Sequence, residues 1–229
     1  MRRIGLLGGM SFESSMIYYR LLNEGVRERL GGLNSADCLL HSVNFDTIAT
    51  MQSSSRWDEA GQYLAKAASG LEQAGAQCIL IGAVTMHLVA DAVEQAVHVP
   101  LINIVDATAG QLAAAGCRRP LLLATRYTME HGFYQERMAR HGITIITPDS
   151  AGRSATHGII FNELCRGQIL DASRRLLVDL IATAKDEGAD SVIFGCTEIG
   201  LILDPSALPL PAFDSAAIHV AAALDFALG

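Results

Sequence analysis

The sequence predicts an α/β protein built from two similar halves, each a parallel sheet with helices on both faces. Two observations lead to this prediction. Short apolar runs typical of buried strands alternate with longer helical patterns along the whole chain. One stretch also occurs twice without a gap, because Gly75–Ala83 resembles Gly188–Cys196 at an offset of 113 residues. We therefore expect an internal duplication.

Two weaker matches flank the repeated stretch in the same order. Arg2–Leu7 resembles Arg118–Leu123 at an offset of 116 residues, and Val99–Asn103 resembles Leu210–Phe213 at an offset of 111. Similar halves are expected to face each other across an active-site cleft, with Ala83 and Cys196 at equivalent positions on its opposite walls. The predicted halves are residues 1–105 with 212–229, and residues 106–211.

Composition excludes several classes of function. Of the 229 residues, half are hydrophobic and 18% are charged, and the net charge of −7 leaves no basic patch for nucleic acid. The five cysteines form no C-x-x-C pair, and no signal peptide precedes them, which indicates reduced thiols in a cytoplasmic enzyme. No apolar run approaches the ~18 residues of a membrane span. No His, Cys and carboxylate set has the spacing of metal ligands.

The first 115 residues should contain four strands and their helices. Continuous apolar runs predict strands, and amphipathic patterns predict the intervening helices. The expected strands are 3–7, 38–45, 78–81 and 99–104, and the expected helices are 13–30, 57–73, 86–96 and 107–115.

The remainder of the chain should repeat this plan. The Gly-Ala-Asp-Ser turn and the Pro-rich 205–211 segment separate its last elements. The expected strands are 121–124, 143–147, 192–194 and 212–213, and the expected helices are 130–141, 154–164, 170–185 and 215–228.

The segment after the strand 192–194 is the strongest candidate for chemistry. Gly195 ends the strand, and Cys196, Thr197 and Glu198 follow where a helix can begin, with Thr197 as a candidate N-cap. A thiol beside the positive end of a helix has a lowered pKa, so Cys196 is predicted to be a reactive thiolate. The alternative is a buried, inert cysteine.

Other candidates remain open. The Gly8-Gly9-Met10-Ser11 turn suits a small anion, but it lacks the G-x-G-x-x-G pattern of dinucleotide sites. The polar segment 52–56 follows a strand and is either a ligand loop or a solvated connector. His87 and His219 are either proton shuttles, with His219 placed to orient Cys196, or structural histidines. No Gly-x-Ser-x-Gly elbow supports a serine hydrolase.

Several motifs together resemble the aspartate/glutamate racemase family. Those motifs are Ile4–Ser11, Thr85-Met86-His87, Gly195–Glu198 and Phe213–His219. Two further segments, Thr125–Glu130 and Phe161–Cys165, resemble the broad-specificity bacterial branch of that family. The resemblance extends over nearly the whole chain, from residue 4 to residue 228.

This resemblance implies two Rossmann-like parallel-sheet halves related by a pseudo-twofold axis. It also implies catalysis without pyridoxal phosphate or metal, in which two acid/base residues on opposite walls exchange the α-proton of an acidic amino acid. A homodimer is the assembly that the resemblance suggests. Cys196 corresponds to the family's cysteine in the second half.

The chain departs from the family pattern in the first half. The family has a cysteine or threonine followed by Asn-Thr, whereas this chain has Ala83-Val84-Thr85. Alanine cannot carry a proton, so one catalytic position is vacant, and Val84 lacks the amide that would bind the substrate carboxylate. By correspondence with the family, the substrate-binding residues are expected to be Met10, Ser11, Gln52, Val84, Thr85, Thr125, Thr128, Thr197 and Glu198.

The predicted function is therefore a cofactor-independent racemase of aspartate or glutamate, impaired where Ala83 replaces the second acid/base residue. Two alternatives stay open. A decarboxylase of a malonate-type substrate needs only one proton donor, which suits Cys196 opposite an apolar wall. A binding protein that kept the pocket and lost turnover would also fit.

Overall fold

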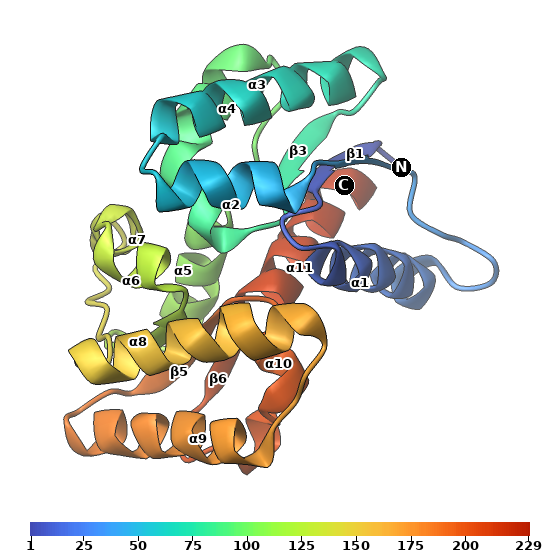
Figure 1. Cartoon of the computed structure of the whole chain (residues 1–229). Helices are drawn as coiled ribbons and strands as arrows, with labels where there is room; N and C mark the ends of the chain where they lie inside the picture. Colours follow the sequence, from blue (N-terminus) through green and yellow to red (C-terminus); the bar gives the residue numbers. More distant parts are fainter. The chain divides into compact units, whose positions relative to one another are not determined.

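The structure is a computed structural model that describes residues 1–229, and Figure 1 shows its elements. The chain forms two compact units, and unit 1 comprises Met1–Ile104 and His219–Gly229. Unit 2 comprises Val105–Ile218, so the chain returns to the first unit seven residues later than the 212 of the sequence-based division. The difference arises because strand β6 (Ala212–Asp214) pairs with strand β5 (Ser191–Gly195) and therefore stays in unit 2.

Unit 1 contains a three-stranded parallel sheet in the order β2-β1-β3. Its elements in chain order are β1 (Ile4–Gly8), α1 (Phe12–Leu30), β2 (Cys38–Ser42), α2 (Phe45–Ser53), α3 (Trp57–Gln73), β3 (Cys78–Ile81), the 3₁₀ helix η1 (Val84–Val89), α4 (Ala90–Ala96) and most of α11 (Ser215–Leu228). Helices α3 and α4 lie side by side over the sheet (Figure 1).

Unit 2 contains a second three-stranded parallel sheet, in the order β4-β5-β6. Its remaining elements are α5 (Ile104–Ala114), β4 (Pro120–Ala124), α6 (Arg126–Glu130), α7 (Phe133–Ala139), α8 (Ser150–Gly158), the π-helix η2 (Ile159–Glu163), the 3₁₀ helices η3 (Leu164–Arg166) and η4 (Pro205–Ala207), α9 (Asp171–Asp186) and α10 (Ile199–Ile202).

The strand register confirms the two similar halves. In unit 1, β1 pairs with β3 from Ile4↔Cys78 onwards, and in unit 2, β4 pairs with β5 from Pro120↔Ser191 onwards. These pairs are related by the 116-residue and 113-residue offsets of the sequence repeat. The third offset holds as well, because Ile79 pairs with Leu101 as Val192 pairs with Ala212.

The two sheets differ at their edges, where one unit has a full strand and the other has only a single β-bridge. Beside β3, the first half has only an isolated bridge at Leu101, where the second half has the strand β6. Beside β4, the second half has only a bridge at Ile146, where the first half has β2. The strands expected at 99–104 and 143–147 are therefore reduced to single bridges.

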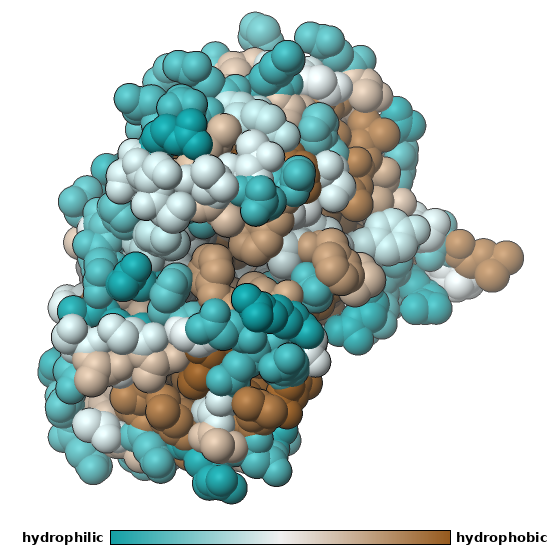
Figure 2. Space-filling view, in the orientation of Figure 1, coloured by the Kyte–Doolittle hydropathy of each residue, from teal (hydrophilic) through white to brown (hydrophobic).

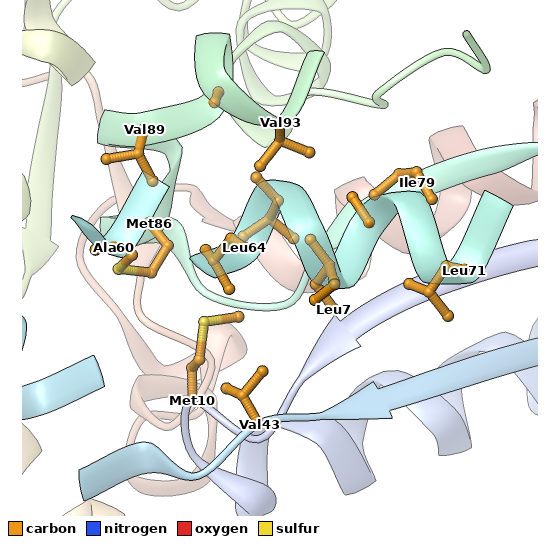
Figure 3. Packing of buried hydrophobic residues seen from close by; sticks show 14 of the residues in the cluster. Leu7, Met10, Val43, Ala60, Leu64, Leu71, Ile79, Met86, Val89 and Val93 are labelled. Carbon is orange, nitrogen blue, oxygen red and sulfur yellow. The ribbon is translucent and has the colours of Figure 1, made fainter. Parts of the chain in front are cut away.

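Each unit has its own apolar core. The core of unit 1 joins the sheet to α3 and α4, and Figure 3 shows Leu7, Leu64, Met86 and Val93 packed together there. All four of these side chains are fully buried. In unit 2, Leu123 and Phe194 of the sheet pack with residues of α9 and α10. Burial on both faces explains why four strands, β1, β3, β4 and β5, read as continuous apolar runs.

The helices differ from the sequence expectation at several places. The expected helix 86–96 is divided, because residues 84–89 form the 3₁₀ helix η1 and α4 begins only at Ala90. Residues 45–53 form α2 instead of extending a strand, because the Asn44 side chain caps this helix by accepting from the Asp46 N–H. The expected helix 130–141 breaks at Gly132, which adopts a positive φ of 82°. The expected helix 154–164 passes into the π-helix η2.

Some apolar surface remains exposed. Figure 2 shows hydrophobic residues at the tip of the loop that follows α1, where Leu33 is fully exposed. Phe12, Met16 and Tyr19 along α1 are each more than half exposed. None of the helices is long and apolar enough to cross a membrane.

Candidate active site

The repeated strands β3 and β5 end in the same way. Each is followed by a close approach to its neighbouring strand, and a Cβ added at Gly82 or at Gly195 would lie 3.1 Å from the carbonyl oxygen of Leu7 or Leu123, respectively. Such contacts leave little room for a side chain, so glycine is favoured at both positions. The next residue is Ala83 in unit 1 and Cys196 in unit 2. The two residues are therefore equivalent within their own sheets.

Cys196 is hydrogen-bonded to a buried carboxylate. Its Sγ donates to Oε2 of Glu198 over 2.9 Å, and the hydroxyl of Thr197 donates to the same oxygen over 2.6 Å. Glu198 is only 3% exposed, whereas Cys196 keeps part of its surface accessible. Cys196 is therefore the less buried residue of this pair, and Glu198 is almost fully covered.

The resting state of Cys196 differs from the expected thiolate. Burial raises the pKa of the thiol well above its usual value, and the negative charge of Glu198 raises it further. A hydrogen bond from the backbone N–H of Glu198 lowers the pKa but does not outweigh these causes. The expected helix also begins later, at Ile199, and it has only four residues, so little dipole opposes burial. Cys196 is therefore a neutral thiol at rest.

A second thiol contacts the same carboxylate. Sγ of Cys165 donates to Oε1 of Glu198 over 3.6 Å, so the two carboxylate oxygens face different cysteines. Cys165 lies in η3, immediately after the π-helix η2. Sequence reasoning did not assign a role to Cys165. The only signal was its place in the Phe161–Cys165 motif, because the contact depends on how residues 33 positions apart come together.

The three threonines of unit 2 that the sequence analysis assigned to substrate binding have local partners. Thr197 was expected to cap the helix after Cys196, but its hydroxyl donates to Glu198, and Glu198 at the N-cap position makes no side-chain cap bond. Thr125 caps α6 by accepting from the backbone N–H of Thr128, and the two hydroxyls lie 3.2 Å apart. These threonines therefore shape the strand ends beside Cys196.

In unit 1, Ala83 is held by its backbone. Nδ1 of His87 lies 3.1 Å from the Ala83 carbonyl oxygen, and the Ile104 N–H points to Nε2 of His87 over 3.3 Å. Because Nε2 accepts, the ring proton is on Nδ1 and is donated to Ala83. His87 is thus a structural group behind the vacant position.

His219 does not orient Cys196. Its Nε2 bonds the Ile102 carbonyl over 2.6 Å, and its Nδ1 lies 2.8 Å from the Tyr18 hydroxyl, which donates to it. Both ring nitrogens are used inside unit 1, and the side chain is fully buried. Burial lowers the pKa of His219 to about 4, so the ring is neutral.

The other expected residues of unit 1 gather near the ends of β1 and α2. Ser11 caps α1 by accepting from the Ser14 N–H over 3.1 Å. Nε2 of Gln52 lies 3.1 Å from Sδ of Met86, and Gln52 belongs to the last turn of α2, not to a loop. Met10 is buried in the core of unit 1, close to Val43 in Figure 3.

Val84 and Thr85 continue the first-half segment. Both are buried at the start of η1, with exposed fractions of 6% and 7%. Val84 brings no polar group to this turn, in contrast to the Thr197 and Glu198 that follow Cys196. Acid/base chemistry is therefore concentrated in unit 2.

A cavity elsewhere in unit 2 lacks such chemistry. It has a volume of about 600 Å³ and is lined mainly by α9, α10 and the segment that follows α10. Its arginine, Arg174, is already bonded to the Ile202 carbonyl and to Asp171. No group of three or more His, Cys, Asp and Glu side chains is arranged to hold a metal ion. The Cys196 segment therefore remains the candidate active site.

Comparison with known proteins gives a consistent family. A family model described as Asp/Glu/Hydantoin racemase matches residues 7–223. The chain is 23% identical over 218 residues to the broad specificity amino-acid racemase RacX of Bacillus subtilis, with 93% of each chain covered.

Two solved structures are similar over their full length. A candidate Asp/Glu racemase from Yersinia pestis is 46% identical, with a TM-score of 0.93 and all of both chains covered. An aspartate racemase homologue from Pyrococcus horikoshii is 33% identical, with a TM-score of 0.88 and the same coverage.

Proposed function

Because the chain belongs to the Asp/Glu/hydantoin racemase family, we propose that it acts on the α-proton of an acidic amino acid, aspartate or glutamate. Cys196 is the proposed acid/base residue. The observation that carries this proposal is the thiol of Cys196 directly after β5, hydrogen-bonded to the buried carboxylate of Glu198. A thiol beside a carboxylate can give a proton to a carbanion and, once deprotonated, can take one from carbon.

The proposed reaction does not use pyridoxal phosphate. That cofactor is held by a lysine as a Schiff base. The chain has two lysines, Lys66 and Lys185, and both are exposed on helices, α3 and α9.

Racemisation by this chain is proposed to be slow. A racemase takes the α-proton from one face of the carbon and returns a proton to the other, which requires two proton carriers. Cys196 is one carrier, but the equivalent residue in unit 1 is Ala83. Exchange of the α-proton on one face is therefore expected to be faster than inversion.

Isotope exchange tests this proposal. The protein is incubated with L-glutamate or L-aspartate in deuterated water, α-deuterium is followed by proton NMR, and the D-isomer is measured by chiral chromatography. We expect deuterium incorporation in excess of inversion, and none in Cys196→Ala. If wild type incorporates no deuterium and forms no D-isomer with either amino acid, the proposal is refuted.

The apolar pair Ala83-Val84 favours one alternative, decarboxylation of a malonate-type substrate. Loss of carbon dioxide leaves a carbanion that needs a single proton, and a neutral Cys196 thiol could supply it. Release of carbon dioxide from an arylmalonate, without exchange of amino-acid α-protons, would favour this reaction. Calorimetric binding of glutamate or aspartate with neither reaction would identify a binding protein.

The proposed assembly is a homodimer. Phe12, Met16 and Tyr19 recur at helical spacing on α1 and are 62%, 57% and 56% exposed, which is a larger apolar stripe than isolated surface residues produce. Sedimentation velocity should give a dimer for wild type and a monomer for Met16→Glu. A wild-type monomer at micromolar concentration would exclude this assembly.

A further inference from the structure

Glu198 is a buried carboxylate in direct contact with the proposed acid/base residue. Its side chain is 3% exposed, and two thiols and one hydroxyl donate hydrogen bonds to it. Removal of a carboxylate from water is costly, and hydrogen bonds to its oxygens offset that cost. One of these donors is the thiol of Cys196.

The two oxygens of Glu198 have different partners. Oε2 receives the protons of Cys196 and Thr197, at 2.9 and 2.6 Å, and Oε1 receives that of Cys165, at 3.6 Å. The Cys196 contact is short for a bond from sulfur, so donor and acceptor are close enough to exchange the proton. The Cys165 contact is longer, and it constrains the carboxylate from the other side.

We propose that Glu198 is the proton-exchange partner of Cys196, so that the two residues share one proton between Sγ and Oε2. Cys165 is a positioning residue that holds Oε1 and thereby orients Oε2 towards Cys196. The pair is a property of unit 2 alone. Its use on an acidic amino acid rests on the function proposed above.

The proton balance of this step is simple. At rest the thiol is protonated and Glu198 is a carboxylate, so the pair carries one negative charge. Transfer of the S–H proton to Oε2 gives a thiolate and a neutral carboxylic acid, with the same total charge. The thiolate then takes the α-proton, and the C–H electron pair stays on the substrate. In the reverse direction the S–H bond breaks and its proton goes to carbon.

Two titratable groups influence the pKa of the Cys196 thiol by their charge. Glu198 and Cys165 are the titratable groups whose charge acts on Cys196, and both raise its pKa. On the neighbouring strand β6, the Asp214 carboxylate accepts from the Ala216 and Ala217 N–H groups and caps α11. Removing the charge of Glu198 should therefore change the titration of Cys196 more than any other single substitution.

Alkylation against pH tests the pair without any substrate. The rate of Cys196 modification by iodoacetamide is measured by mass spectrometry from pH 6 to pH 11 in wild type and Glu198→Gln. Glutamine keeps the size and the hydrogen-bond acceptor but not the charge. We expect the midpoint of the rate profile to fall by roughly one to three pH units in Glu198→Gln, as for a group losing a like charge at close range.

Two controls separate this effect from general loss of charge. Glu187→Gln removes the same charge from an exposed position before the other end of β5, and the midpoint should not move. Glu198→Asp keeps a negative charge next to the thiol, and the midpoint should stay above that of Glu198→Gln even if the shorter side chain loosens the bond. An unchanged midpoint in Glu198→Gln would overturn the pairing.

Deuterium exchange then tests the catalytic use of the pair. Glu198→Gln should lower exchange at the α-carbon by about 10²–10⁴-fold although its thiolate is more abundant, because the proton acceptor is gone. Equal exchange in wild type and Glu198→Gln would refute the catalytic role while the proposed function stands. If wild type exchanges no acidic amino acid, the proposed function fails, and the alkylation profile still decides whether Glu198 and Cys196 form a pair.

Cys165→Ala tests the positioning role. It removes one donor from Glu198 but no charge and no proton carrier. The alkylation midpoint of Cys196 should move by less than in Glu198→Gln, and exchange should fall less than in that variant. An effect of Cys165→Ala equal to that of Glu198→Gln on exchange, with no shift of the midpoint, would mean that Cys165 itself carries the proton.

Discussion

The segments after β3 and β5 have the same backbone plan and different chemistry. In both units a glycine approaches the neighbouring strand, and the next residue stands at the carboxyl end of the sheet. In unit 1 that residue is Ala83, whose carbonyl is bonded by His87. In unit 2 it is Cys196, bonded to Glu198. The comparison shows that the duplicated scaffold is retained where one copy has no proton carrier.

The largest expected effect comes from making the first segment like the second. Ala83→Thr combined with Val84→Asn should raise racemisation of aspartate or glutamate by about 10²–10⁴-fold, because one positioned acid/base group typically contributes this much. The double variant is compared with wild type by chiral chromatography. Overpacking in place of alanine should cost roughly 1–3 kcal/mol of stability.

The matched control for this gain is Ala83→Val with Val84→Asn. Valine has the shape of threonine without its hydroxyl, so it should not raise racemisation. Cys196→Ala in the threonine background should abolish the activity. A folded Ala83→Thr/Val84→Asn protein that binds the amino acid and shows no gain would mean that the two segments do not serve one substrate.

The next effect concerns the neutral histidine of unit 1. The pKa of His219 is about 4 in the folded protein and 6.5 in its unperturbed form, so the unfolded chain binds more protons between these values. Stability from His219 is present above pH 6.5 and is lost as the pH falls towards 4, by at most about 1.4 kcal/mol per pH unit. Chemical denaturation at several pH values measures this slope.

His219→Asn should reduce the pH slope of unfolding, since asparagine does not titrate. His41→Asn is the control, because it replaces an exposed histidine on β2. If His219→Asn and wild type lose stability in parallel between pH 6.5 and 4, His219 is not the buried neutral group described here.

A smaller effect should distinguish the two glycines. A Cβ at Gly195 would meet Cδ1 of Leu122 at 2.6 Å and Cβ of Ala124 at 2.9 Å, whereas at Gly82 the nearest side-chain atom is Cδ1 of Leu6 at 3.3 Å. Gly195→Ala should therefore destabilise by roughly 1–3 kcal/mol, and Gly82→Ala by less. Urea denaturation of both variants compares them. A larger loss of stability in Gly82→Ala than in Gly195→Ala would show that the residues around Gly195 adjust to a methyl group more easily than those around Gly82.

The smallest effect concerns the helix caps after the first strand of each unit. Ser11 caps the 19-residue α1 with a bond of 3.1 Å, and Thr125 caps the five-residue α6 with a bond of 3.4 Å. Ser11→Ala should cost about 1 kcal/mol, and Thr125→Ala less, because its bond is longer and its helix shorter. Thermal unfolding followed by circular dichroism provides the comparison, and a larger loss in Thr125→Ala would contradict it.

Much of the fold could be predicted because the strands of one half recur, as short apolar patterns in the same order, in the other half. The offsets of 113 and 116 residues were sufficient to predict which strands are equivalent, and the register of β1–β3 and β4–β5 follows them. Helix α2 was missed although Asn44 and Asp46 form a helix start, because the apolar run before them favoured a longer strand. Gly132 likewise marked a break that the surrounding helical pattern concealed.

The protonation state of the site could not be predicted in this way. The position of Cys196 at a strand end was readable, but the sign of its pKa shift depends on burial and on the folded position of Glu198. The contact with Cys165 depends on tertiary structure as well. Sequence position therefore identifies the thiol, whereas its neighbours in space decide whether it rests as thiol or thiolate.

The π-helix Ile159–Glu163 offers a simple route by which evolution can change the surroundings of this site. A π-turn holds one residue more than an α-turn, and each residue of an α-helix turns the chain by about 100°. Deleting one residue there would restore an α-helical turn. The side chains that follow directly in this helical segment, Cys165 included, would then point in another direction. A lineage can therefore change the neighbours of the Glu198 carboxylate by losing a single codon, with no substitution at the strand end where the chemistry lies.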